Sequence, residues 1–186
     1  MRVLLTSTGL EAPALQAQFL SWLDKPPAQA RALFIPTAAI DADAIAVLPK
    51  CMNDLLRCGF PAANIRVFDL HEGMTVTELK GYDAVYLCGG QTRYLLERVN
   101  RTSFGASLMT YIQGGGLVVG VSAGSLIFAG NLPDNLGLLN ATLSVHCAEG
   151  DAPGPLTLPR PDGIRLTNDR GITISSLPDG IRIIGA

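Results

Sequence analysis

A serine lies in a glycine-rich pentapeptide that can present a nucleophile. The segment Gly120-Val121-Ser122-Ala123-Gly124 matches the G-x-S-x-G pattern, at a point where an apolar run gives way to a helical stretch. Small neighbours allow such a turn to expose the serine hydroxyl, and the amides that begin the helix, Ala123 first, point to where an oxyanion would develop. The pattern therefore predicts Ser122 as a catalytic nucleophile, against the alternative of a glycine-rich turn with an incidental serine.

A serine hydroxyl is a weak nucleophile unless a base takes its proton, and the chain holds only two histidines. His146 follows the short apolar run Leu143-Ser144-Val145 and leads into a loop, where a strand can position a side chain beside an open site. His71 follows the run Ile65–Phe68 and is interpreted as an ordinary surface or core histidine. The sequence predicts His146 as the base.

The acid that would orient the base has three candidates. Asp134 precedes the predicted base by a short loop, Glu149 follows it by three residues, and Asp169 lies in a turn. Aspartates in Pro-Asp and Asn-Asp contexts usually form turns, which is the alternative interpretation of Asp134 and Asp169. We predict Asp134 as the acid.

A second strand-to-helix junction carries a glycine pair. In Tyr86–Thr92, Gly89 and Gly90 permit backbone amides to approach a substrate closely, so this loop, which includes Gln91, is a predicted substrate-binding segment and a source for the second oxyanion donor. The segment fits neither the dinucleotide-binding nor the phosphate-binding glycine pattern, so no nucleotide cofactor is expected. No metal is expected either, because the cysteines fit neither a zinc ribbon nor a CxxC pair: Cys51, Cys58, Cys88 and Cys147.

Short apolar runs alternate with helical stretches through the first two thirds of the chain. This pattern is typical of βαβ units around a parallel sheet that is buried on both faces. The expected strands are 3–5, 32–35, 65–68, 84–87 and 117–121. The expected helices are about 12–23, 43–58, 92–99 and 104–113.

The last third is rich in proline and glycine and favours loops and short strands. Runs at 164–167, 171–174 and 181–184 are separated by the turn segments Asn168–Gly171 and Pro178–Gly180. They predict a terminal antiparallel meander that ends in a hairpin.

Length and composition favour one globular domain over residues 1–186, since 186 residues with 48% hydrophobic content can bury a core without disulfides. The formal charge of −2 and scattered arginines argue against a nucleic-acid partner. No run is long enough for a signal peptide core or a membrane span, so we expect a cytoplasmic protein without a membrane partner.

The glycine pair with Gln91, the elbow around Ser122 and the Ser144-Val145-His146 segment together resemble the peptidase E family, and the Leu166–Ile172 segment is similar to the family's tail. The resemblance spans most of the chain. By motif it implies Ser122 as the nucleophile, His146 as the base, and the amides of Gly90 and Ala123 as the oxyanion donors. It implies a flavodoxin-like three-layer αβα sandwich with a mostly parallel sheet, of the class I glutamine amidotransferase-like kind, and hydrolysis of short peptides, with aspartyl dipeptides as known substrates. Homodimers are common for this architecture.

The chain departs from the family pattern at two points that concern the implied dipeptidase activity. The stretch between Ser122 and His146 is shorter than in a typical dipeptidase, and Gln91 replaces an asparagine. Three arginines could grip an aspartyl side chain, namely Arg93, Arg160 and Arg170. The alternatives to a serine peptidase are a ligand-binding member of the fold and an esterase or amidase with a non-peptide substrate.

Overall fold

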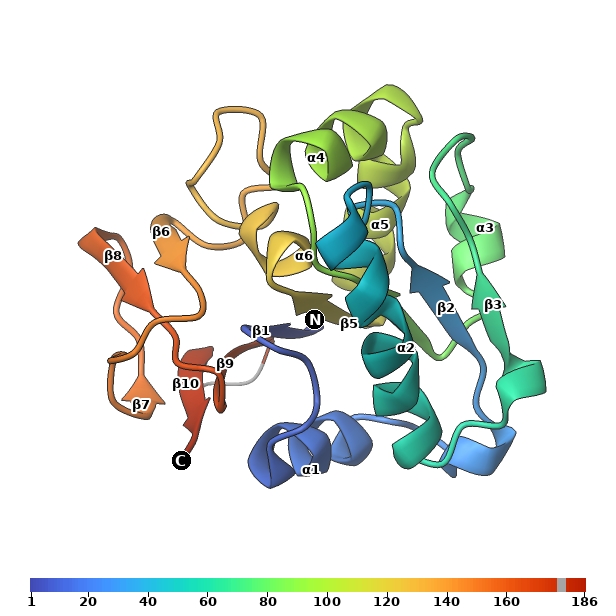
Figure 1. The fold of residues 1–186 in the computed structure, drawn as a ribbon, viewed down its shortest axis with the longest axis horizontal. Helices are drawn as coiled ribbons and strands as arrows, with labels where there is room; N and C mark the ends of the chain where they lie inside the picture. Colours follow the sequence, from blue (N-terminus) through green and yellow to red (C-terminus); the bar gives the residue numbers. More distant parts are fainter. Residues whose placement is uncertain (177–179) are drawn as a thin grey trace.

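The computed structural model describes residues 1–176 and 180–186. Its main sheet has eight strands in the order β3-β2-β4-β5-β1-β9-β10-β7, and β6 and β8 form a second, two-stranded sheet (Figure 1). The strands are β1 Arg2–Thr6, β2 Ala32–Ile35, β3 Ile65–Val67, β4 Ala84–Leu87, β5 Leu117–Val121, β6 Ala141–Ser144, β7 Gly154–Pro155, β8 Arg160–Arg165, β9 Arg170–Ser175 and β10 Ile181–Gly185. The α-helices are α1 Pro13–Ser21, α2 Ala42–Arg57, α3 Val76–Leu79, α4 Thr92–Arg101, α5 Phe104–Gln113 and α6 Ala123–Leu126.

Five parallel strands, β3, β2, β4, β5 and β1, form one side of the main sheet. They coincide with the five apolar runs of the sequence to within about one residue at each end, and the α/β class is confirmed. The alternation of side chains along β1 explains why the apolar runs are uninterrupted. Val3 and Leu5 face one core while Leu4 faces the other, so both faces of the sheet are covered.

The main sheet lies between two layers of helices, and a hydrophobic core fills the space on each face of the sheet. One core packs α1 and α2 on the sheet through residues such as Phe19 and Leu55. The other core packs α4, α5 and α6 on the opposite face and is centred on large side chains such as Phe104 and Phe128. The sandwich architecture implied by the resemblance is therefore present.

Local contacts explain where helix α2 begins and ends. Asp41 caps its N-terminus, because the Asp41 side chain accepts a hydrogen bond of 2.8 Å from the amide of Ala44. Gly59, with φ of +95°, follows its C-terminus. The N-terminal end of α2 lies at the carboxyl edge of the sheet, because α2 follows the carboxyl end of β2 along the chain.

The predicted terminal meander is only partly correct. β9 and β10 do form an antiparallel hairpin, and β9 also pairs with β1. β8 leaves this group and pairs in parallel with β6 instead, in the small sheet (Figure 1). Gly163 permits that close pairing, because its φ is +73° and a Cβ there would lie 2.4 Å from the Thr142 hydroxyl oxygen. The predicted turn at Pro178–Gly180 includes two residues outside the described part, Pro178 and Asp179.

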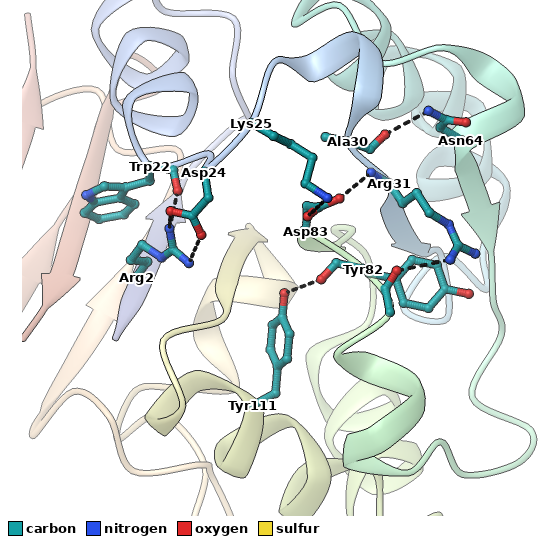
Figure 2. A network of polar contacts seen from close by, with 11 residues as sticks. Arg2, Trp22, Asp24, Lys25, Ala30, Arg31, Asn64, Tyr82, Asp83 and Tyr111 are labelled. Atoms are coloured by element: carbon teal, nitrogen blue, oxygen red, sulfur yellow. Dashed lines mark hydrogen bonds and ion pairs between the residues drawn. The ribbon is translucent and has the colours of Figure 1, made fainter.

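A polar network joins the amino ends of the parallel strands (Figure 2). Arg2 binds both carboxylate oxygens of Asp24 at 2.8 Å, and the Asp83 carboxylate accepts from the amide of Arg31 at 2.8 Å. The hydroxyl of Tyr111 donates to the carbonyl of Tyr82 at 3.0 Å. These contacts stabilise the amino edge of the sheet, whereas ligands of open α/β sheets generally bind at the opposite, carboxyl edge.

Candidate active site

The serine elbow lies between β5 and α6 and has an unusual backbone. Ser122 has φ of 50° and ψ of −110°, and its amide donates to the carbonyl of Thr6 at 3.0 Å. A non-glycine residue in this region typically costs about 1–3 kcal/mol and persists only where neighbours enforce it. Here the flanking glycines are required for packing. A Cβ at Gly120 would lie 2.5 Å from the Gly124 carbonyl oxygen, and one at Gly124 would lie 2.4 Å from the Leu87 carbonyl oxygen.

A buried hydroxyl below the elbow holds β1 and β5 together. Oγ of Ser125 accepts a hydrogen bond from the amide of Thr6 at 2.9 Å and lies 2.8 Å from the carbonyl oxygens of Thr6 and Gly120. Ser125 is fully buried. It therefore satisfies backbone groups that the sharp turn would leave unpaired.

His146 lies beside Ser122, as the sequence analysis expects. Nε2 of His146 is 3.1 Å from Oγ of Ser122. His146 follows β6 and has φ of 57°, and its amide donates to the hydroxyl of Ser7 at 2.6 Å. His71 belongs to another surface, where its Nε2 lies 2.8 Å from Oδ2 of Asp69. The structure thus brings one of the two histidines to the serine.

The structure does not bring Asp134 to His146. The carbonyl of Asp134 accepts from the side chain of Asn100 on α4 at 3.0 Å, and its carboxylate lines a separate hollow with Arg93. In the described ranges Asp134 therefore has no hydrogen bond to His146, because the loop after α6 packs against α4 rather than turning back to the serine. Of the two alternatives, Asp169 accepts a hydrogen bond from Thr167, which lowers the pKa of Asp169, and Glu149 is exposed in the loop after His146.

The partner of Nδ1 is an amide that the sequence analysis missed. Oδ1 of Asn168 lies 3.0 Å from Nδ1 of His146. Asn168 stands in the connection from β8 to β9, in an Asn-Asp-Arg-Gly segment that has the composition of an ordinary turn. No local signal separates this asparagine from a turn former. Only the antiparallel pairing of β9 with β1 places it at the carboxyl edge.

The glycine pair after β4 lies against the serine. A Cβ on Gly89 would be 3.2 Å from Cβ of Ser122. Within residues 1–176 and 180–186, the amides of Gly90 and Ala123 donate no hydrogen bond to the chain. Gln91 differs from its glycine neighbours, because its amide donates to the Ala38 carbonyl at 2.7 Å and its side chain does not line the cavity described next. Two backbone donors are thus left free beside Ser122.

A cavity of about 360 Å³ opens in front of Ser122 and His146. One face of α2 forms its wall, and the ends of β1, β4 and β5 form its floor. The wall is apolar in the middle, at Val47 and Leu48, and carries charge at its ends. The complete lining is Ser7, Thr8, Asp41, Asp43, Ala44, Val47, Leu48, Lys50, Cys51, Gly89, Gly90, Val121, Ser122 and His146.

The residues that line this cavity carry more negative than positive charges. Two carboxylates, Asp41 and Asp43, line it, and its lining cation, Lys50, forms an ion pair of 3.0 Å with Glu11. The three arginines considered in the sequence lie elsewhere. Arg93 lines the hollow with Asp134, Arg160 pairs with Asp151 at 2.6 Å, and Arg170 donates to the carbonyls of Gly150 and Asp151.

A buried carboxyl group supports the cavity from behind. Oδ2 of Asp54 on α2 accepts from the hydroxyl of Tyr86 at 2.6 Å and from the amide of Leu10 at 2.8 Å. Burial raises the pKa of Asp54 and raises the pKa of Tyr86 well above its usual value. Gly9 has no room for a side chain, since a Cβ would lie 2.1 Å from Oδ2. The group joins α2, β4 and the segment after β1.

Residues 1–176 and 180–186 contain no group of three or more His, Cys, Asp or Glu side chains that could hold a metal ion. Across the same ranges no helix combines the length and the apolar character that a bilayer span needs.

Comparison with known proteins gives consistent matches. The profile of peptidase family S51 matches residues 3–135. An uncharacterized peptidase of Listeria monocytogenes is 28% identical over 99 residues, which is 53% of this chain and 48% of the relative. The chain thus matches about half the length of that relative.

Two solved structures share the fold. A candidate peptidase E from Listeria monocytogenes has a TM-score of 0.76 at 18% identity, covering 100% of this chain and 98% of the other. A peptidase from an acI-B1 Actinobacterium has a TM-score of 0.68 at 18% identity, covering 100% of this chain and 87% of the other. At these identities the match establishes the architecture.

Proposed function

The chain belongs to peptidase family S51, which confirms the resemblance to the peptidase E family, and on this premise we propose that it is a serine peptidase that cleaves short peptides. The observation that supports the proposal most directly is the 3.1 Å separation of Nε2 of His146 from Oγ of Ser122. A nucleophile and a base within hydrogen-bond reach are the minimum that acyl transfer requires. The same distance argues against the alternative of a member that only binds ligands.

The proposed reaction has two halves. Nε2 of His146 takes the proton of Ser122 while Oγ attacks the scissile carbonyl carbon, and the free amides of Gly90 and Ala123 donate to the oxyanion. The resulting imidazolium donates its proton to the leaving amine as the C–N bond breaks. A water then gives a proton to His146 and attacks the acyl carbon. As the bond from that carbon to Oγ breaks, the His146 imidazolium returns the proton to Oγ, which releases the carboxylic acid and restores the Ser122 hydroxyl.

The charges that line the cavity also indicate which class of peptide it accepts. An acidic side chain entering it would meet the carboxylates of Asp41 and Asp43, and the lining cation Lys50 is already paired with Glu11. Like charges disfavour each other most where water is partly excluded. We propose that the cavity accepts peptides whose residue there is neutral or basic, in place of the aspartyl peptides that the family resemblance implied.

One experiment tests both the chemistry and the substrate class. Wild type and Ser122→Ala are incubated with a fluorophosphonate probe and with a panel of acidic, neutral and basic dipeptides and small esters. Loss of a nucleophile from such a set typically lowers turnover by about 10⁴- to 10⁶-fold. Ser21→Ala, at an exposed serine at the end of α1, is the matched control and should label and hydrolyse like wild type.

The outcomes separate the alternatives. Labelling that persists in Ser122→Ala would contradict the nucleophile assignment. Ester cleavage without peptide cleavage would favour an esterase. Wild type that neither labels nor hydrolyses any member of the panel would favour a ligand-binding protein.

A further inference from the structure

Two cysteines face each other where helix α2 packs on the end of strand β4. The hydroxyl of Tyr86 on β4 donates to Oδ2 of Asp54 on α2 at 2.6 Å, which fixes the helix against the strand. Cys51 precedes Asp54 by three residues and so lies on the same face of the helix. Cys88 follows Tyr86 by two residues and enters the same core. Because α2 leads from the carboxyl end of β2 back to the amino end of β3, the two cysteines form the next contact toward the carboxyl edge.

The two thiols of this pair differ in their readiness to ionise. Cys51 is 6% exposed and Cys88 is fully buried. A hydrogen bond from the thiol of Cys88 lowers the pKa of Cys51. Burial, together with the same hydrogen bond, raises the pKa of Cys88 well above its usual value. The pair therefore combines a thiol that forms a thiolate more readily with a neutral thiol that donates to it.

Small molecules can reach Cys51, because it lines the same cavity as Ser122. A thiolate in such a position is the reactive form of cysteine. The other two cysteines lack these features. Burial raises the pKa of Cys58 to about 11, and the thiol of Cys147 donates to a main-chain carbonyl at 3.8 Å. Within the described ranges neither of them lines the cavity or has a hydrogen bond to another thiol.

We propose that Cys51 and Cys88 form a site of reversible oxidation by peroxides, and that the disulfide between them switches the active site off. The loss of activity rests on the proposed serine peptidase function, whereas formation of the disulfide does not. None of the chemistry involves Ser122 or His146.

The oxidation has two steps. The Cys51 thiolate attacks one oxygen of hydrogen peroxide, the O–O bond breaks, and the departing hydroxide takes up the proton that the Cys51 thiol released. This step leaves a sulfenic acid on Cys51 and one water. The sulfur of Cys88 then attacks the sulfur of the sulfenic acid, and the displaced hydroxide takes the Cys88 proton and leaves as a second water. The two thiols lose two electrons, which the peroxide gains, and a dithiol reductant reverses the reaction by exchange.

The disulfide acts on the site through the two residues that follow Cys88. An S–S bond is about 2.05 Å long, which is shorter than any contact between two thiols, so α2 and the end of β4 must shift toward each other. Gly89 packs against Ser122, since a Cβ on Gly89 would lie 3.2 Å from Cβ of Ser122. Gly90 carries the proposed oxyanion donor. Because a displacement of about 1 Å at such a site can lower turnover by about 10²-fold, we expect the oxidised protein to lose kcat by roughly 10- to 100-fold.

Peptide mapping detects the disulfide without any need for turnover. Reduced wild type is treated with hydrogen peroxide, alkylated and digested with trypsin, which cleaves after Lys and Arg. The disulfide then joins peptide 51–57 to peptide 81–93. We expect this linked pair in the oxidised protein together with the loss of kcat on the best peptide of the panel. Dithiothreitol should reverse both changes.

Three substitutions assign the two roles, and each variant is compared with its own reduced form. In Cys88→Ala the sulfenic acid on Cys51 has no thiol partner, so dimedone should trap it. In Cys51→Ala neither the linked pair nor a dimedone adduct on Cys88 should form, and peroxide should no longer lower kcat. Cys58→Ala is the matched control, because it removes a buried thiol at the C-terminal end of α2, and it should respond to peroxide like wild type.

The results distinguish failure of this inference from failure of the proposed function. Absence of the linked pair from folded, oxidised wild type overturns the inference. A linked pair without a loss of kcat, or an equal loss in Cys51→Ala, overturns the switch while the peptidase stands. If reduced wild type neither labels at Ser122 nor hydrolyses the panel, the peptidase proposal fails. The linked peptides then still decide whether the two cysteines form an oxidation site.

Discussion

Replacement of Gly90 by alanine is the most direct test of the proposed oxyanion donor. Gly90 has φ of +138°, and a Cβ there would lie 2.1 Å from the carbonyl oxygen of Ala38. Ordinary contact begins near 3.4 Å, so the two segments must separate by about 1.3 Å. The Ala38 carbonyl cannot move freely, because it accepts the 2.7 Å hydrogen bond from the amide of Gln91. The strain must therefore displace the amide of Gly90 itself.

The expected effect has two parts. A side chain at this dihedral costs about 1–3 kcal/mol of stability before the collision is counted. Loss of one oxyanion donor typically lowers kcat by about 10²- to 10³-fold, and a displacement of about 1 Å has an effect of similar size. We therefore expect Gly90→Ala to lower kcat on the best peptide of the panel by at least about 10²-fold, while KM changes little because the lost interaction forms only in the transition state.

Gly115→Ala is the matched control. Gly115 also has a positive φ, of +93°, but a Cβ there would have nothing within 4 Å, and the residue lies in the connection from α5 to β5 at the amino edge. The Gly115→Ala variant should show the loss of stability in chemical unfolding that a side chain at a positive φ causes, and it should keep the wild-type kcat. If Gly90→Ala retains wild-type kcat in a folded protein, the amide of Gly90 is not the donor and the reasoning is refuted.

Three further predictions concern the supports of the site. Ser125→Ala should lower the free energy of unfolding by about 1–3 kcal/mol, because it leaves the buried amide of Thr6 without an acceptor; an unchanged urea midpoint would contradict this. Burial raises the pKa of Asp54 in the folded state, so its contribution favours folding below the ordinary pKa and is lost as pH rises through the folded value. Asp54→Asn should therefore gain stability relative to wild type as urea unfolding is followed from pH 4 to pH 7, and a constant difference would argue against a raised pKa. Asp43→Asn should narrow the difference in kcat/KM between basic and acidic dipeptides by a few-fold, and a widened difference would contradict the proposed charge preference.

The parallel part of the sheet was predictable because each strand carries its own evidence. Both faces of β1 and β4 are buried, so every residue from Val3 to Leu5 and from Ala84 to Leu87 must be apolar or small, and a short apolar run results. The elbow was predictable for a related reason. Gly120 is required by a local contact with the Gly124 carbonyl, so the pattern can be recognised in the sequence even though Gly124 itself is required by the distant carbonyl of Leu87.

The pairing of β8 could not be predicted in the same way. Its residues have the composition of any short strand near a turn, and its choice of β6 over β9 depends on contacts such as that of Gly163 with Thr142, far apart in the sequence. The residue that contacts Nδ1 of His146 could not be predicted from the sequence for the same physical reason. Asp134 precedes the base by a short loop along the chain, whereas Asn168 reaches His146 only through the pairing of β9 with β1.

The central position of β1 has a consequence for synthesis of the chain. Of the strands described above, β1 leaves the ribosome before the others, yet it lies between β5 and β9 in the finished sheet. Its backbone on the β9 side has no partner until residues 170–175 have emerged. Because Val3, Leu4 and Leu5 are fully buried in the native protein, the nascent chain carries an open, apolar strand edge during most of translation. The time that the ribosome takes from β5 to β9 therefore sets how long this edge is exposed to aggregation or needs a chaperone.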